Sequence, residues 1–125
     1  MPDQQRFHAF TGDTAPIFAN DAERECAQIL DFHGIPWDYE PHTFTLQVDA
    51  EGNTLEAFTP DFYLPEQDLY LEITTMKQSL VTKKNRKMRR LRELHPGLRV
   101  KLFYKRDIEA LAAKYELDVA PQQVA

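Results

Sequence analysis

Apolar residues recur along the chain with two different spacings, one typical of helices and one typical of strands. The places where the spacing changes predict the helices and strands. From residue 20 to residue 34, apolar residues recur three and four positions apart, as they do in a helix with one buried face. Asn20 is a good N-cap, Glu23 completes a capping box three residues later, and Gly34 ends the helix. A second stretch with helical spacing covers residues 79–94 and stops at a Pro-Gly pair.

Between these two helices the period changes to two, which is typical of strands. The alternation predicts strands over residues 37–48, 55–64 and 69–75, joined by short turns into a three-stranded meander. Pro41 and Pro60 interrupt the first two strands. Because proline cannot donate to a sheet ladder, we expect an edge or a bulge at Pro41 and a bend at Pro60.

A fourth strand is predicted over residues 98–104, and a last helix begins with Asp107 as its cap. The predicted order is therefore α-β-β-β-α-β-α. A helix that joins two strands of one sheet implies a parallel pair, so the fold class is α/β with a mixed sheet flanked by helices. We expect an N-terminal arm over residues 1–19, one domain over 20–116 and a flexible tail over 117–125.

The composition is that of an ordinary globular domain. The 125 residues are 42% hydrophobic and 28% charged, which is enough to bury one core. The single cysteine, Cys26, excludes an internal disulfide and a thiolate metal cluster. No apolar run reaches the length of a membrane span, and the N-terminus lacks the layout of a secretory signal. These features predict a cytoplasmic protein that does not enter a membrane.

Charge is distributed unevenly along the chain, and most of the basic residues lie in one segment. Residues 1–76 carry 2 basic and 15 acidic side chains, whereas residues 77–106 carry 12 basic and 1 acidic side chain. Like charges on one helix repel each other, and a polyanion would relieve that repulsion. The basic helix therefore predicts a nucleic-acid contact; the alternative is a solvated face that pairs with the acidic half of the chain. The cations predicted to contact nucleic acid are Lys83, Lys84, Arg86, Lys87, Arg89 and Arg90.

A carboxylate interrupts the most apolar stretch of the chain, since Glu72 stands between Leu71 and Ile73. With both faces of the sheet covered, a buried Glu72 must be paired or bound to a metal. Asp61 lies on the neighbouring hairpin strand, so the hairpin brings the two carboxylates together. Two carboxylates held close favour a hard cation such as Mg²⁺, which can polarise a phosphate and generate hydroxide. The alternatives are an ordinary turn at Asp61 and a charge at Glu72 that discourages edge-to-edge aggregation.

These residues resemble the PD-(D/E)XK nuclease superfamily. The resemblance lies in Pro60-Asp61, in Glu72-Ile73-Thr74 on the next strand, and in the basic helix that follows. The predicted elements between residues 20 and 104 are also similar to the α-β-β-β-α-β core of that family. The resemblance implies a restriction-endonuclease-like fold and metal-dependent cleavage of DNA phosphodiester bonds, with Mg²⁺ as cofactor and Mn²⁺ as its substitute.

The resemblance also implies roles for individual residues. Asp61 and Glu72 would be the metal-binding catalytic carboxylates, and the Ile73 carbonyl would be a further ligand. An acidic residue of the first helix often completes the site. Glu23 is the candidate for this catalytic and metal-binding role, and Glu25 is the alternative.

The chain departs from the family pattern at one position. The family lysine would stand at residue 74, where this sequence has a threonine. That lysine orients the attacking water and stabilises the developing charge. Lys77 is the catalytic candidate to replace it, with Lys84 or Lys87 reaching in from the basic helix as the other option.

Three functions remain open at this stage. The first is a DNA endonuclease that selects shape or structure, because few side chains are placed to read bases; RNA is the other substrate option. The second is a nuclease-like module that binds nucleic acid without cutting it. The third is an adaptor whose basic helix docks an acidic protein. For the nuclease, the short chain favours a homodimer or a larger protein partner.

Overall fold

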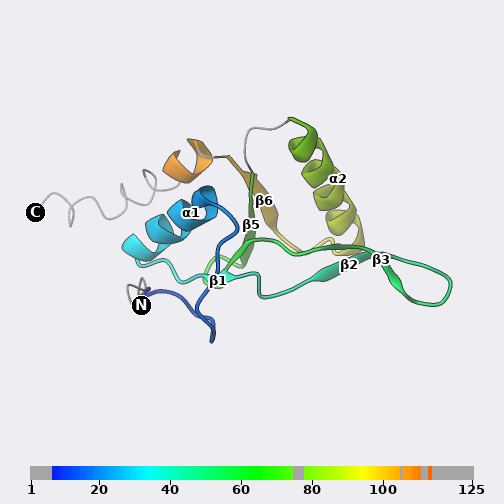
Figure 1. Cartoon of the computed structure of the whole chain (residues 1–125), viewed down its shortest axis with the longest axis horizontal. Helices are drawn as coiled ribbons and strands as arrows, with labels where there is room; N and C mark the ends of the chain where they lie inside the picture. Colours follow the sequence, from blue (N-terminus) through cyan, green and yellow to red (C-terminus); the bar gives the residue numbers. More distant parts are fainter. Residues whose placement is uncertain (1–6, 75–77, 105, 111–112, 114–125) are drawn as a thin grey trace, which may run out of the picture.

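The computed structural model describes residues 7–74, 78–104, 106–110 and 113. It confirms the predicted mixed α/β architecture, in which two strands at the centre of the molecule stand between two helices (Figure 1). The elements, in chain order, are α1 (Asp21–Phe32), β1 (Asp38–Tyr39), β2 (Phe44–Val48), β3 (Thr54–Phe58), β4 (Phe62–Leu64), β5 (Leu69–Ile73), α2 (Gln78–Leu94) and β6 (Val100–Phe103).

The main sheet has four strands in the order β1-β4-β5-β6. β1 pairs with β4 and β4 pairs with β5 in antiparallel fashion, whereas β5 and β6 are parallel. The parallel pair is joined through α2, as the helix between the two predicted strands required. The register places Phe62 opposite Leu71, and therefore places Asp61 beside Glu72.

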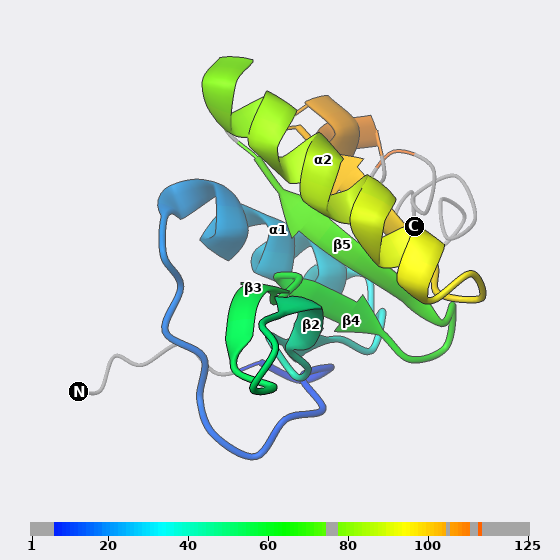
Figure 2. The same cartoon turned by 90° about the vertical axis from the view of Figure 1, so that its right-hand side faces the viewer.

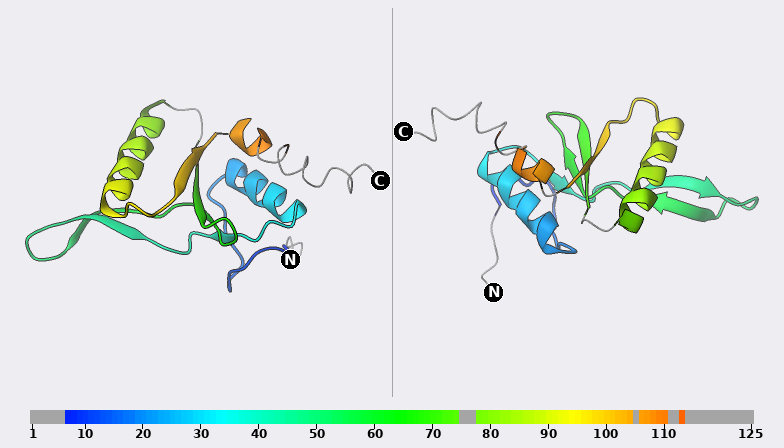
Figure 3. Two further views of the ribbon diagram at one scale, coloured as in Figure 1. Left: turned by 180° about the vertical axis from the view of Figure 1, so that it is seen from behind. Right: turned by 90° about the horizontal axis from the view of Figure 1, so that it is seen from above.

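The first two predicted strands are each broken in two, and this corrects the prediction of a continuous meander. β1 and β4 remain in the main sheet, while β2 and β3 pair only with each other, starting with Phe44 opposite Phe58. Pro41 and Pro60 lie at the two breaks, and Glu40 has a positive φ of 49° that turns the chain. The β2–β3 hairpin therefore leaves the sheet and extends past α2 (Figure 3).

The first helix begins and ends as predicted. The Asn20 side chain accepts a hydrogen bond from the Glu23 amide at 2.9 Å, and Gly34 has a positive φ of 69°. One detail of the predicted capping box is wrong. The Glu23 carboxylate accepts its hydrogen bond from the Ala19 amide at 3.0 Å, one residue before the cap.

The described part of the N-terminal arm packs onto the core around Trp37, which is fully buried. Asp31 of α1 holds the arm in place, because it accepts hydrogen bonds from two backbone amides of the arm and from the Trp37 indole at 3.1 Å. The aromatic rings that the arm brings to this indole are those of Phe7, Phe10 and Phe18.

Strand β5 divides the core into two parts. Leu71 and Ile73 belong to the cluster that packs against α1, whereas Tyr70 packs against Met88 and Leu91 of α2. Side chains alternate along a strand, so Glu72 points to the same face as Tyr70 and lies under α2. Figure 2 shows α2 crossing in front of this face of β5.

The last predicted strand is shorter in the structure. The predicted strand over residues 98–104 is β6, with four residues. Residue 106 is already helical, so Asp107 does not stand at the N-cap position; its carboxylate accepts a hydrogen bond from the Tyr104 amide. The predicted tail over residues 117–125 lies outside the described residues. Among the described helices, none is long and apolar enough to cross a membrane.

Candidate active site

Asp61 and Glu72 lie side by side, as the sequence predicted, and the backbone of each strand holds the carboxylate of the other. The Asp61 amide donates to Glu72 Oε1 at 3.2 Å, and the Ile73 amide donates to Asp61 Oδ2 at 2.8 Å. Both residues are only 6% exposed. The hairpin between β4 and β5 therefore fixes two buried carboxyl groups at one point of the sheet.

The two carboxyl groups are electrostatically costly. Burial raises the pKa of Asp61 to about 8, and the charges of Glu72 and Glu23 add to this rise. Burial also raises the pKa of Glu72, although Lys84 counteracts the rise. A pKa raised in this way means that the ionised form lacks sufficient compensation from its surroundings. An additional cation at this point would stabilise the ionised pair.

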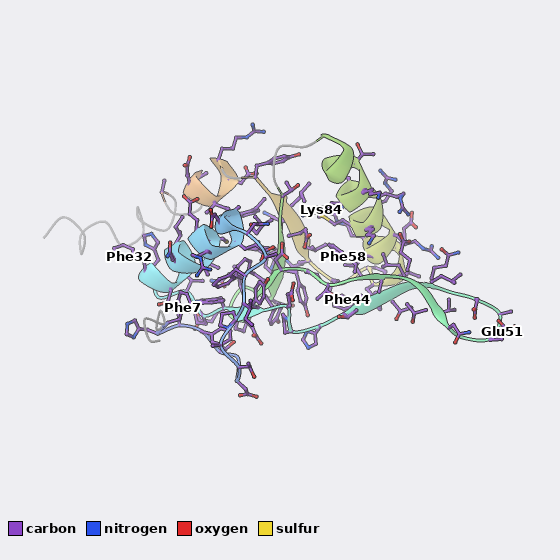
Figure 4. The ribbon with its side chains drawn as sticks, in the orientation of Figure 1. Phe7, Phe32, Phe44, Glu51, Phe58 and Lys84 are labelled. Atoms are coloured by element: carbon purple, nitrogen blue, oxygen red, sulfur yellow. The ribbon has the colours of Figure 1, made fainter. Side chains whose placement is uncertain are left out.

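Lys84 is the cation that reaches the pair. Its Nζ lies 3.0 Å from Glu72 Oε2 and also donates to the Ile73 carbonyl. Figure 4 shows Lys84 on the side of α2 that faces the sheet. Lys84 therefore lies on the face of α2 that meets the sheet. Its spacing from buried Met88 and Leu91, four and seven residues on, already places it on the buried face.

The structure distinguishes among the lysines considered as replacements at the position of Thr74. Lys84 lies against Glu72, whereas Lys87 donates to the Ala57 carbonyl at 3.3 Å. Lys77 lies outside the described residues. Thr74 itself is 3% exposed, and its amide continues the sheet by donating to the Phe103 carbonyl.

Glu23 is near the pair but is bound elsewhere. Its Oε1 accepts a hydrogen bond from the Tyr39 hydroxyl at 2.6 Å, in addition to the one from the backbone of the arm. Its charge raises the pKa of both Asp61 and Glu72. Glu25 is only partly buried, and its charge acts on Cys26. Within the described parts of the chain, no three His, Cys, Asp or Glu side chains are grouped closely enough to hold a metal ion.

A hollow of about 320 Å³ opens between α2 and β3 above Glu72. Ammonium groups dominate one wall, and the other wall comes from the end of the hairpin. A phosphate group in this hollow would lie near several lysines, partly shielded from water, where electrostatic interactions are stronger than in water. The residues that line the hollow are Ala57, Phe58, Thr59, Glu72, Lys83, Lys84 and Lys87.

The donor set at the pair fits a hard divalent cation. The Lys84 ammonium binds the Glu72 carboxylate and the Ile73 carbonyl together, so two oxygen ligands already converge on one positive charge. The Asp61 carboxyl lies beside them, and the Ile73 amide and Lys84 compensate its charge only in part. Carboxylate and main-chain carbonyl oxygens are ligands that Mg²⁺ and Mn²⁺ accept, with water and substrate filling the other positions.

The remaining cations of α2 are divided between internal pairs and solvent. Arg86 forms an ion pair with Glu56 of β3 at 2.8 Å, and Arg90 lies 3.6 Å from Glu93 on its own helix. Lys83 and Arg89 are exposed. The basic helix therefore makes some of the contacts with the acidic half of the chain that the alternative interpretation expects.

No protein-family model, curated protein or solved structure was found to match this chain. The functional assignment therefore rests on the geometry and the charges of the site.

Proposed function

We propose that the protein is a metal-dependent nuclease that hydrolyses phosphodiester bonds of DNA, with Mg²⁺ as cofactor and Mn²⁺ as substitute. The observation that carries this proposal is the buried Asp61–Glu72 pair, with Lys84 bridging Glu72 and the Ile73 carbonyl at the base of a lysine-lined hollow. The fold we propose is restriction-endonuclease-like. Its core would be α1, β1, β4, β5, α2 and β6, with the β2–β3 hairpin inserted after the first core strand.

In this proposal, each residue of the site has a distinct task. The chemistry that Mg²⁺ would supply here is polarisation of the phosphate and a lower pKa for a bound water. Asp61, Glu72 and the Ile73 carbonyl would hold the ion. Lys84 contacts the Glu72 carboxylate and the Ile73 carbonyl, would release them to the ion, and would then stabilise negative charge on the phosphate and orient the attacking water. In the reaction, the water oxygen would bond to phosphorus and the water would lose a proton to solvent, while the bond from phosphorus to one bridging oxygen would break and the leaving oxygen would take up a proton from solvent.

The test is a cleavage panel of plasmid, single-stranded, flapped and four-way-junction DNA with structured RNA, in Mg²⁺ or Mn²⁺. Asp61→Asn, Glu72→Gln and Lys84→Met are compared with the wild type. Glu66→Gln, a carboxylate on an exposed turn, is the matched control. We expect cleavage by the wild type and the control that is lost in both site carboxylate variants. Cleavage that survives in both of these variants would refute the proposal.

A binding module without catalysis is the second candidate, and one observation favours it. Lys84 already supplies a positive charge to Glu72 and to the Ile73 carbonyl, and an ammonium group fixed there could replace a metal permanently. Titration of Mn²⁺ into the wild type and into Lys84→Met separates the two candidates. A binding module would take up Mn²⁺ only after Lys84 is removed and would bind DNA in a salt-sensitive way without cutting it. A protein that neither cuts nor binds nucleic acid would favour the adaptor.

A further inference from the structure

A second hollow lies on the outer side of α2, away from Glu72. Its volume is about 320 Å³, which is at the small end of pockets that hold a ligand, about 300–1,000 Å³. Three arginines of α2 meet the hairpin here. The hairpin passes under α2 and continues beyond it (Figures 1 and 3), so it supplies the opposite wall. The lining residues are Gln47, Glu56, Arg86, Arg89, Arg90 and Glu93.

The contact between Glu56 and Arg86 shows which chemistry this hollow accepts. Arg86 Nη2 lies 2.8 Å from Glu56 Oε2, and its Nη1 lies 3.5 Å from Oε1, so the guanidinium approaches the carboxylate with both arms. The same fork geometry binds two oxygens of a phosphate. Hydrogen bonds from Arg86 lower the pKa of Glu56, which keeps the carboxylate ionised. The Glu56 carboxylate therefore occupies the position at Arg86 that a phosphate of a ligand would take.

The two hollows lie along the same boundary between α2 and the hairpin. Lys84 lines the first and Arg89 and Arg90 line the second, five and six residues further along the helix. At about 1.5 Å per residue, this separation is about 8–9 Å along the helix axis. At about 3.6 residues per turn these arginines also project from another side of α2 than Lys84, so a strand must span at least this axial distance between the two hollows.

We propose that α2 and the β2–β3 hairpin bind one unpaired nucleic-acid strand across both hollows, and that Glu56 occupies the place of a phosphate at Arg86 until the strand binds. The second hollow is then a phosphate subsite separate from the bond at Glu72. The assignment of that bond rests on the proposed nuclease function. Each hollow is bounded by α2 on one side and by residues of the hairpin or of its end on the other, so these two elements would flank a single strand on both sides.

The experiment measures binding without cleavage. A fluorescein-labelled strand of twelve deoxythymidines is titrated in EDTA, and its anisotropy is followed at several salt concentrations between 25 and 200 mM. Glu56→Gln should tighten binding about two- to five-fold, since it frees Arg86 from an exposed ion pair. It should also steepen the slope of log K against log [salt] by about 0.7, the value for one further phosphate contact on a single strand.

Removal of two arginines that line the second hollow should weaken binding and its dependence on salt. Arg89→Ala with Arg90→Ala should make the slope shallower by about 0.7–1.4. The charge-matched control is Arg24→Ala with Arg99→Ala, two exposed arginines outside both hollows, and it should leave the slope unchanged. Misfolding cannot explain a gain of affinity in Glu56→Gln, so that variant keeps the test decisive even if the arginine double variant fails to fold.

Three further ligands identify what the surface binds. A duplex of the same length should bind more weakly than the single strand, polyglutamate more weakly still, and the matching RNA strand about as well as DNA. The proposal is overturned if Glu56→Gln leaves affinity and slope unchanged, or if the duplex or polyglutamate binds as tightly as the single strand. Cleavage lost in Asp61→Asn with no effect of Glu56→Gln on binding would keep the nuclease and reject the subsite. The reverse pattern would keep the subsite and reject the nuclease.

Discussion

Replacing Asp61 by asparagine should make the metal-free protein more stable at alkaline pH while it removes the proposed activity. Asparagine has nearly the same shape, and its side-chain oxygen can still accept the hydrogen bond that Asp61 Oδ2 takes from the Ile73 amide. It carries no charge, so the repulsion between residue 61 and Glu72 disappears. The substitution therefore separates the structural role of this side chain from its role as a proposed ligand.

The magnitude follows from the raised pKa. The pKa of Asp61 is about 8 in the folded protein, against 3.8 for an unperturbed aspartate. Between these two pKa values, Asp61 is protonated in the folded state and ionised in the unfolded state. The free energy of unfolding therefore falls as pH rises, until the contribution of Asp61 is lost at about pH 8. A rise of the pKa from 3.8 to about 8 would correspond to at most about 6 kcal/mol of the free energy of unfolding. We expect about 2–3 kcal/mol, because proteins relax and admit water when a buried group ionises.

The assay is urea denaturation in EDTA at pH 5, 6, 7, 8 and 9. The wild type should lose stability steadily over this range, whereas Asp61→Asn should show a much shallower decline. The two proteins should differ least at pH 5 and most near pH 9. Asp13→Asn, at an exposed position of the arm, controls for the loss of one negative charge. Mg²⁺ added at pH 8 should stabilise the wild type and have little effect on Asp61→Asn.

A flat or rising stability of the wild type between pH 5 and pH 8 would refute this reasoning, since it would mean that Asp61 ionises without cost. An equal pH slope in the wild type and in Asp61→Asn would refute the assignment of the slope to this residue. Stabilisation of both proteins by Mg²⁺ to the same extent would place the ion at another site.

Two further predictions concern α2 and the arm. Lys84→Met should lower the free energy of unfolding by about 1–3 kcal/mol at pH 8 and by less at pH 5, where its partner Glu72 can take up a proton. Urea denaturation measures this loss, with Lys83→Met at an exposed position as the control. Equal losses at both pH values would contradict the prediction. Gly12→Ala should cost about 1–3 kcal/mol, because the added Cβ would lie 2.4 Å from Phe10 Cζ. Gly97→Ala, where no atom lies within 4 Å, is the control in the same denaturation assay, and an equal loss in both glycine variants would contradict the steric reason.

Much of the fold was predictable because its signals are local. The spacing of apolar residues and the Asn20 cap defined α1, and the apolar run with short flanking turns defined β5 and its hairpin. The helix between two strands required the parallel pair. The closeness of Asp61 and Glu72 was also predictable, since a short hairpin leaves few alternatives for the register.

The path of the β2–β3 hairpin could not be predicted in the same way. Pro41 and Pro60 show that ladder hydrogen bonds are missing, but a bulge, an edge and a departure from the sheet all satisfy that condition. The choice among them depends on whether the hairpin can bury Leu46 and Phe58 elsewhere. It does so against Tyr70 and α2, which are distant in sequence.

The sequence alone was sufficient to predict the two long helices, the mixed sheet with its parallel pair, the paired carboxylates and the concentration of positive charge on one helix. These features follow from periodicity, capping and chain connectivity, which act over a few residues. The tertiary structure decided that Lys84 meets Glu72, that Glu23 binds the Tyr39 hydroxyl, and that Glu56 meets Arg86. Long side chains have many rotamers, and their partners are selected by the packing of whole elements. Spacing along the chain therefore cannot specify those contacts.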